Sequence, residues 1–260
     1  GISVDIVAKT LEVIAGHDEN DPATSSIPSN FDFNFSSATN NISLKGIRLG
    51  LLDSKNSNPQ VIELHKKLKE IVNSLGGELI LIDDDRDYPV DAESYVLLYE
   101  FRVGLEEYLN NANSSMKKLT DIIDFNNANK DIVMPYFGQD IFYQSIASTS
   151  YLKYLWSKYK LNKSYKSTKD LLEKYDLDAF IGLTRGPAWK INYDGGDYVA
   201  MNDSPQFGSG GYAAHNGMPH ITIPYFEINK FPVGISLIGD RWSDKAIIEY
   251  ASAIEKSRYN

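Results

Sequence analysis

GSGGYAAHNGMPHITIPYFEINKFPVGISLIG, residues 208–239, is the stretch that decides the fold of this chain. Its pattern predicts a glycine-rich loop, one short helix and two strands joined by a polar turn at 227–230. Ser209 is expected to cap the helix start, and Gly217 with Pro219 to end the helix. The glycines at 208, 210 and 211 let the backbone approach a ligand or another segment closely. The stretch therefore indicates an α/β core with a glycine-lined approach to it.

The rest of the chain alternates predicted strands and helices. A strand at 46–52, a helix that begins at Pro59 and a strand at 78–82 form a β-α-β unit, so these two strands should be parallel with a right-handed crossover. Further elements are a buried strand at 177–183 and helices at 3–16, in pieces between 92 and 149, at 151–175 and at 244–254. This content predicts an α/β fold built as a single compact unit over 1–260, with one weak boundary in the polar loop 17–43.

Composition excludes several classes of function. The chain has 260 residues and no cysteine, so disulfides, thiol nucleophiles and cysteine metal sites are excluded. A net charge of -9 argues against nucleic acid as a partner, and no run approaches the ~18 apolar residues of a membrane span. Lysines alternate with aromatic residues at 153–169, which favours a solvated helix face over a phosphate-binding surface. In the same helix, the residues expected to face a core are Leu152, Leu155, Trp156, Tyr159, Leu171 and Leu172.

Several short motifs occur together along the chain. Val-Ile-Ala-Gly at 13–16 precedes Asp-Pro-Ala at 21–23, Gly-Pro-Ala-Trp lies at 186–189, and Ile-Thr-Ile-Pro at 221–224 precedes Pro-Val-Gly-Ile-Ser-Leu-Ile-Gly at 232–239. In this order they resemble the C-terminal core of amidase signature enzymes, which hydrolyse carboxamides, and Gly-Pro-Ala-Trp is similar to the peptide-amidase subgroup. The resemblance implies a mixed β-sheet core flanked by helices, as part of an α/β/α sandwich, and no cofactor.

The resemblance also implies where the chemistry lies. Amidase signature enzymes use a serine, a second serine held by a cis peptide, and a lysine that precedes the Gly- and Ser-rich segment containing both serines. No such segment occurs in this chain. The catalytic residues are therefore expected upstream of Gly1, which would make the chain the C-terminal part of an amidase and inactive alone. The alternative is a non-catalytic, amidase-derived binding or scaffold domain.

The partners follow from the same resemblance. They are a small-molecule or peptide amide substrate and the missing N-terminal half of the protein. Self-association of the isolated chain is expected where the missing half leaves a strand edge or an apolar face uncovered. A cytoplasmic location is favoured, although any signal peptide would lie upstream of Gly1.

Two loops are expected to line the substrate pocket. One follows the strand at 177–183, and ligands of α/β proteins gather beyond the carboxyl ends of strands. The other is the glycine-rich loop that precedes the short helix. Matched to the family, these loops imply six pocket residues, which are Gly186, Pro187, Trp189, Ser209, Gly210 and Gly211.

Three other kinds of site compete with this interpretation. A Ser-His-Asp site could combine Ser209, His215 and Asp203, but no strand is expected before the serine and the nucleophile-elbow pattern lacks its first glycine. A metal site at His215 and His220 is disfavoured because a Gly-Met-Pro break separates the two histidines. The aspartates of 83–87 could hold a hard cation, but an exposed acidic loop is favoured because nothing completes a calcium-binding pattern.

Overall fold

The computed structural model describes residues 1–86, 88–201 and 205–258 of the chain. The contacts divide the chain into two compact units. The expected boundary loop at 17–43 lies inside the first of them. Unit 1 comprises Gly1–Arg86, Ser167–Asn192 and Gly196–Asn260, and unit 2 comprises Asp87–Lys166 and Tyr193–Gly195.

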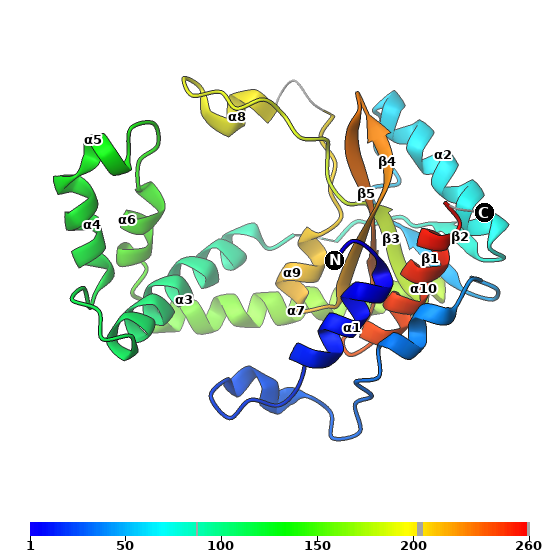
Figure 1. Cartoon of the computed structure of the whole chain (residues 1–260), viewed down its shortest axis with the longest axis horizontal. Helices are drawn as coiled ribbons and strands as arrows, with labels where there is room; N and C mark the ends of the chain where they lie inside the picture. The colour runs from blue at the N-terminus through cyan, green and yellow to red at the C-terminus, as the bar shows by residue number, and fades with distance from the viewer. Residues whose placement is uncertain (87, 202–204, 259–260) are drawn as a thin grey trace. The chain divides into compact units, whose positions relative to one another are not determined.

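Unit 1 is built on a five-stranded mixed sheet with the order β2-β1-β3-β5-β4. β1 pairs in parallel with both β2 and β3, whereas β5 pairs antiparallel with β3 and β4. The hairpin of β4 and β5 therefore lies beside β3 (Figure 1). This arrangement confirms the predicted α/β class with a mixed sheet. The strands are β1 (Arg48–Leu51), β2 (Glu78–Leu81), β3 (Ala179–Leu183), β4 (His220–Ile228) and β5 (Phe231–Ile238).

Local sequence signals account for the connections between these strands. Helix α2 (Pro59–Ser74) begins at a proline and is capped by the Asn58 side chain, which accepts from a backbone N–H of the first turn. It joins two parallel strands, as the sequence predicts. β4 and β5 are joined by Asn229 and Lys230, whose φ angles of 52° and 68° fit a two-residue type I′ turn. The turn is shorter than predicted because residues 227 and 228 still pair within the sheet.

One face of the sheet is covered by helices α1 (Val4–Ile14), α2 and α10 (Asp244–Lys256). Strand residues at alternate positions point to this side, among them Leu49, Ile181 and Ile235, each fully buried. Burial of their apolar surface is the main source of stability of unit 1. The helix residues packed against them include Val4, Ala8, Leu68, Val72, Ile247, Ile248, Ala251 and Ile254.

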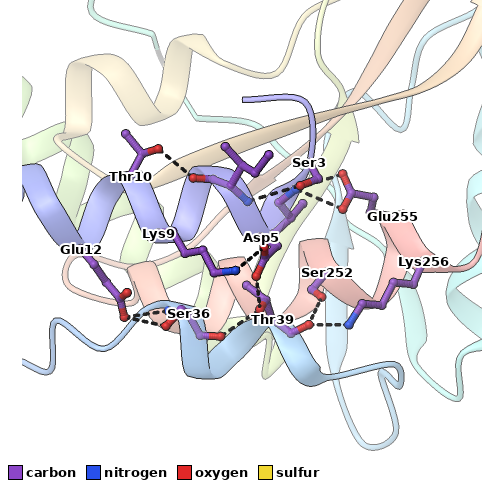
Figure 2. Close-up of polar contacts among 12 residues, drawn as sticks. Ser3, Asp5, Lys9, Thr10, Glu12, Ser36, Thr39, Ser252, Glu255 and Lys256 are labelled. Atoms are coloured by element: carbon purple, nitrogen blue, oxygen red, sulfur yellow. Dashed lines mark hydrogen bonds and ion pairs between the residues drawn. The ribbon is translucent and has the colours of Figure 1, made fainter.

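Polar contacts connect α1, the 3-10 helix η2 (Ser36–Asn40) and α10, as Figure 2 shows. Both carboxylate oxygens of Glu255 accept from the Val4 N–H over 3.1 Å, so a residue near the C-terminus caps the first helix. The Thr39 carbonyl accepts from the Ser252 hydroxyl over 2.8 Å and from the Lys256 ammonium group. The N-terminal helix is therefore an integral part of unit 1.

The described part of unit 2 consists of helices and the loops between them, and α4, α5 and α6 lie together within it (Figure 1). Tyr95, Tyr99 and Tyr154 form a stacked row, with ring centroids 6.5 Å and 4.5 Å apart, which packs α3 against α7. Lys153 lies 4.2 Å above the Tyr95 ring, which adds a cation–π contact. The helices are α3 (Val90–Asn111), α4 (Leu119–Ala128), α5 (Lys130–Val133), α6 (Asp140–Ala147) and the part of α7 (Tyr151–Tyr175) up to residue 166.

The prediction of which face of α7 is buried was partly wrong. Leu171 and Leu172 are buried as predicted, but Leu152, Leu155, Trp156 and Tyr159 are 79%, 45%, 58% and 58% exposed. The buried face of α7 instead carries the small polar residues Ser157, Ser164 and Thr168. Small side chains let neighbouring groups approach the helix closely, and hydrophobic periodicity alone does not detect them. Within the described residues, no helix is both long and apolar enough to cross a membrane.

Candidate functional site

The two loops that carry the predicted pocket residues lie side by side at the carboxyl end of β3. Arg185 forms an isolated antiparallel bridge with Gly208. The N–H of Gly186 donates to the carbonyl of Phe207 over 3.2 Å, which extends the pairing by one residue. The structure thus brings the Gly-Pro-Ala-Trp segment to the glycine-rich loop, about 20 residues further along the chain. It does so by backbone pairing, for which the side-chain pattern contains no signal.

Ser209 is the buried anchor of this pair of loops. Its hydroxyl donates to the Leu183 carbonyl over 2.8 Å, its N–H donates to the Thr184 carbonyl over 3.2 Å, and only 1% of the residue is exposed. The predicted helix cap at Ser209 was wrong, because helix α9 (Gly211–Asn216) has Gly210 as its N-cap with no side-chain bond. A Cβ at Gly182 would lie 2.3 Å from the Ser209 hydroxyl oxygen, so the adjacent strand must carry glycine there.

The other predicted pocket residues differ in exposure. Pro187 is buried, and Trp189 is partly exposed with the Arg185 guanidinium group 5.4 Å from its ring centroid. Gly211, the first residue of α9, is exposed, and Gly210 is half-buried. A Cβ at Gly210 would come within 3.2 Å of the ring of His220. The six residues therefore belong to two paired loops, here called the patch, in which the residues at 186 and 208–211 have small or no side chains.

A row of hydrogen-bonded side chains lies beneath this patch, on the face of the sheet opposite α10. His220 Nε2 lies 2.7 Å from the Ser236 hydroxyl, which in turn donates to the Thr184 hydroxyl over 2.8 Å. Thr184 also shares a hydrogen bond with Thr222. The row therefore connects β3, β4 and β5 at the end of the sheet where the loop of 184–189 leaves β3. Partial desolvation lowers the pKa of the His220 imidazole, which favours its neutral form.

The structure disfavours a Ser-His-Asp site around Ser209. The serine hydroxyl is directed at a backbone carbonyl, and Nδ1 of His215 lies 2.8 Å from the carbonyl of Gly211 within its own helix. A nucleophile needs its hydroxyl hydrogen-bonded to the base instead. Asp203, the third member of that hypothesis, lies outside the described residues.

Two carboxylates of the acidic loop after β2 form ion pairs. Asp83 pairs with Lys55 at the surface, and Asp84 pairs with Arg86, with side chains that are only 15% and 4% exposed. The expectation of an exposed acidic loop is confirmed for Asp83 and Asp85 but was wrong for Asp84, because the buried Arg86 guanidinium group draws its carboxylate inward; Asp87 lies outside the described residues. In residues 1–86, 88–201 and 205–258, no group of three or more histidine, aspartate or glutamate side chains is placed to hold a metal ion.

A cavity of about 310 Å³ opens next to the glycine-rich loop, at the carboxyl ends of β1 and β2. Its volume is at the lower end of the range for small-molecule sites. The Tyr212 side chain of α9 and the Asp84 carboxylate both face it. Burial, and then the nearby charge of Asp84, raise the pKa of the Tyr212 hydroxyl. The remaining lining residues are Leu52, Asp53, Ser54, Lys55, Asn56, Gln206, Phe207 and Gly208.

Sequence reasoning missed the hydroxyl row and the buried ion pair. One signal for the row was available, because Thr222 and Ser236 occupy the strand positions that alternate with the isoleucines of the core. No comparable signal marked Arg86, because its partners come from three separate segments of the chain.

Comparisons with known proteins place these observations in a family. A sequence model of the family described as Amidase matches residues 2–248. Two solved structures of a peptide amidase are similar over nearly the whole chain. One is the native enzyme from Stenotrophomonas maltophilia, 28% identical with a TM-score of 0.85. The other is the peptide amidase PAM in complex with the competitive inhibitor chymostatin, 29% identical with a TM-score of 0.87.

The chain spans about half the length of these relatives. It is covered to 98–99% in the two comparisons, but it covers only 52–53% of the peptide amidase chains. An amidase family protein from Bacillus anthracis str. Ames, 21% identical with a TM-score of 0.74, shares the fold over 99% of this chain and 47% of its own. No match was found among curated protein sequences.

Proposed function

The chain belongs to the amidase family, and from this premise we propose that it is the C-terminal part of an enzyme that hydrolyses carboxamide C–N bonds. The observation that carries the proposal is the alignment of 98–99% of this chain with about half of a peptide amidase. The reaction would form an acyl-enzyme through a Ser-Ser-Lys group that lies upstream of Gly1. In this proposal the chain supplies a wall of the substrate pocket.

The arrangement of the site supports a wall rather than a reacting centre. Amide hydrolysis requires an activated nucleophile, a proton shuttle and donors for the oxyanion. Ser209 is the serine of the patch, and its hydroxyl is buried and bonded to the Leu183 carbonyl. The loop backbones at 185–186 and 207–209 are fixed by pairing, so they present a rigid surface against which an acyl group can be oriented.

The substrate class is a small-molecule or peptide amide. Support comes from the relative that binds chymostatin as a competitive inhibitor, because that protein is a peptide amidase. Gly186, Pro187, Trp189, Ser209, Gly210 and Gly211 would contact the substrate or shape the wall. Glycines keep that wall shallow, and the Trp189 ring would offer an apolar surface beside it.

The proposal is tested by comparing two proteins in one assay. The 260-residue chain and the same chain joined to the protein encoded directly upstream would be incubated with C-terminal peptide amides, and ammonia release would be measured. We expect turnover only from the joined protein. Turnover by the chain alone that is lost in Ser209→Ala would show that the nucleophile lies within this chain. An upstream region with no lysine and no Gly- and Ser-rich segment would favour the non-catalytic binding domain instead.

We also propose that the isolated chain self-associates. Leu152, Leu155, Trp156 and Tyr159 are exposed at helical spacing on α7 and would be an apolar stripe in water. The upstream half is the expected natural cover for surfaces of this kind. Light scattering over a concentration series measures the association, and a monomer at high concentration would contradict the proposal.

A further inference from the structure

Helix α9 follows directly after the glycine-rich loop, and it is too short to be stable by itself. It is six residues long, Gly211–Asn216, and its N-cap makes no side-chain hydrogen bond. Helices this short are unstable without tertiary contacts. Its C-terminus is closed by Gly217 in the left-handed conformation, with φ 61° and ψ 45°, and there the Arg241 guanidinium group donates to the Asn216 carbonyl over 2.7 Å and 3.0 Å. Tertiary contacts must therefore position it.

Arg86 makes such a contact at the first turn of α9. Its guanidinium carbon lies 4.0 Å from the centroid of the Tyr212 ring and 5.2 Å from that of Phe180 on β3. The same group donates twice to Asp84, from Nε over 2.7 Å and from Nη2 over 2.6 Å. A planar guanidinium group that makes two hydrogen bonds to one carboxylate and stacks on an aromatic ring has a fixed orientation. A lysine ammonium group could not reproduce this arrangement.

The same guanidinium group is connected to the last turn of α9. Its Nη1 donates to the Thr168 hydroxyl of α7 over 2.7 Å. That hydroxyl also accepts from Nδ2 of Asn216 over 2.8 Å, and both Thr168 and Asn216 are fully buried. Arg86 thus reaches one end of α9 directly and the other end through a single hydroxyl. These partners come from β3, α7, α9 and the loop after β2.

We propose that Arg86 is a positioning residue that holds α9, and with it the wall residues Gly210 and Gly211 at the start of that helix, in place on the sheet. It also fixes the Tyr212 ring and the Asp84 carboxylate, which line the cavity beside that wall. The structural part of this inference stands on the contacts alone. Its consequence for substrate binding rests on the proposed function.

The structural part is tested by hydrogen exchange of the 260-residue chain. The N–H of Ala214 and the N–H of Met218 are bonded within and just after α9, so a peptide over 211–218 reports its opening. In Arg86→Met, we expect exchange in this peptide to become at least about tenfold faster, because a buried pair loses one partner. Exchange in β5 should remain as in the wild type. Arg86→Lys should be intermediate, because it keeps the charge but not the planar fork.

A double variant separates the loss of the Arg86 contacts to α9 from general unfolding caused by an unpaired buried charge. Arg86→Met leaves the Asp84 carboxylate without its partner, whereas Asp84→Asn/Arg86→Met removes both charges together. The matched control is Arg48→Met, which removes an exposed ion pair with Glu78 in the same unit and should leave 211–218 unchanged. If the double variant folds and 211–218 exchanges at the wild-type rate, the inference is overturned.

The consequence for binding is read in the joined protein. Loss of a pocket wall weakens substrate binding, so Arg86→Met should raise KM at least about tenfold while kcat changes by less than about threefold. A variant that only reduced the folded fraction would lower the apparent kcat and leave KM unchanged. Equal KM values in wild type and variant would contradict the proposed role. If the joined wild type shows no amidase activity, the proposed function fails, and the exchange experiment still decides whether Arg86 holds α9.

Discussion

Gly182→Ala is expected to destabilise unit 1 by displacing one hydroxyl group. The new Cβ would lie 2.3 Å from the Ser209 oxygen, 3.2 Å from Leu52 Cβ and 3.3 Å from Ser209 Cβ. Overpacking of a core site costs about 1–3 kcal/mol. Turning the Ser209 hydroxyl away from the Leu183 carbonyl adds about 1 kcal/mol. We therefore expect the free energy of unfolding to fall by about 2–4 kcal/mol.

A second variant, Ser209→Ala, tests whether the Ser209 hydroxyl is the group that the new methyl group displaces. Ser209→Ala removes the oxygen at 2.3 Å and leaves the milder contacts with Leu52 Cβ at 3.2 Å and residue 209 Cβ at 3.3 Å, so it relieves most of the clash. Alone it should cost about 1 kcal/mol for the lost hydrogen bond. The double variant should be more stable than the sum of the two single effects predicts, by about 1–2 kcal/mol.

The assay is urea unfolding followed by tryptophan fluorescence. Of the three tryptophans, Trp156 lies in unit 2, so a Trp156→Phe background leaves Trp189 and Trp242 to report unit 1 alone. Gly16→Ala is the matched control, since a Cβ there meets no heavy atom within 4 Å, and it should change stability by less than about 0.5 kcal/mol. Single effects that add within about 0.5 kcal/mol would refute the clash with the hydroxyl.

Three further outcomes follow from the same contacts. Gly234→Ala would place a Cβ 2.6 Å and 2.7 Å from two threonine hydroxyls and should cost about 1–3 kcal/mol, seen as a lower Tm; an unchanged Tm would show that the hydroxyl row yields easily. Burial alone would raise the pKa of Asp84, but the hydrogen bonds and charge of Arg86 outweigh it and lower the pKa. The Asp84 carboxylate therefore contributes stability that is fully present above its unfolded pKa of about 3.9 and is lost as the pH falls below that value, so wild type and Asp84→Asn should converge on acid titration. Glu255→Gln weakens the cap on the Val4 N–H and should cost about 1 kcal/mol, read as faster hydrogen exchange in α1 but not in β5.

Packing of side chains from distant segments explains why some expectations about the site were wrong. Ser209 fits the sequence pattern of a helix cap, yet the bridge between Arg185 and Gly208 places its hydroxyl against β3 before α9 begins. Asp84 belongs to an acidic run typical of a solvated loop, yet it is drawn inward with Arg86, whose guanidinium group contacts Thr168 and Tyr212 from distant segments. In each case a contact across the fold outweighs the local preference.

The sequence by itself determined the elements whose signals are local. Proline and asparagine at the start of α2, the left-handed Gly217 after α9 and the alternation of isoleucines in β4 and β5 act within a few residues, so the β-α-β unit and the hairpin could be predicted. Only the tertiary structure decided which face of α7 is buried, where the Ser209 hydroxyl points and what holds α9. Those outcomes depend on groups far apart in the chain, such as Ser209 and Leu183, where |i−j| is 26, and Arg86 and Thr168, where |i−j| is 82. Their energies arise only when the sheet has brought the partners together, because hydrogen bonds and ion pairs act over a few ångströms and leave no periodic trace in the sequence.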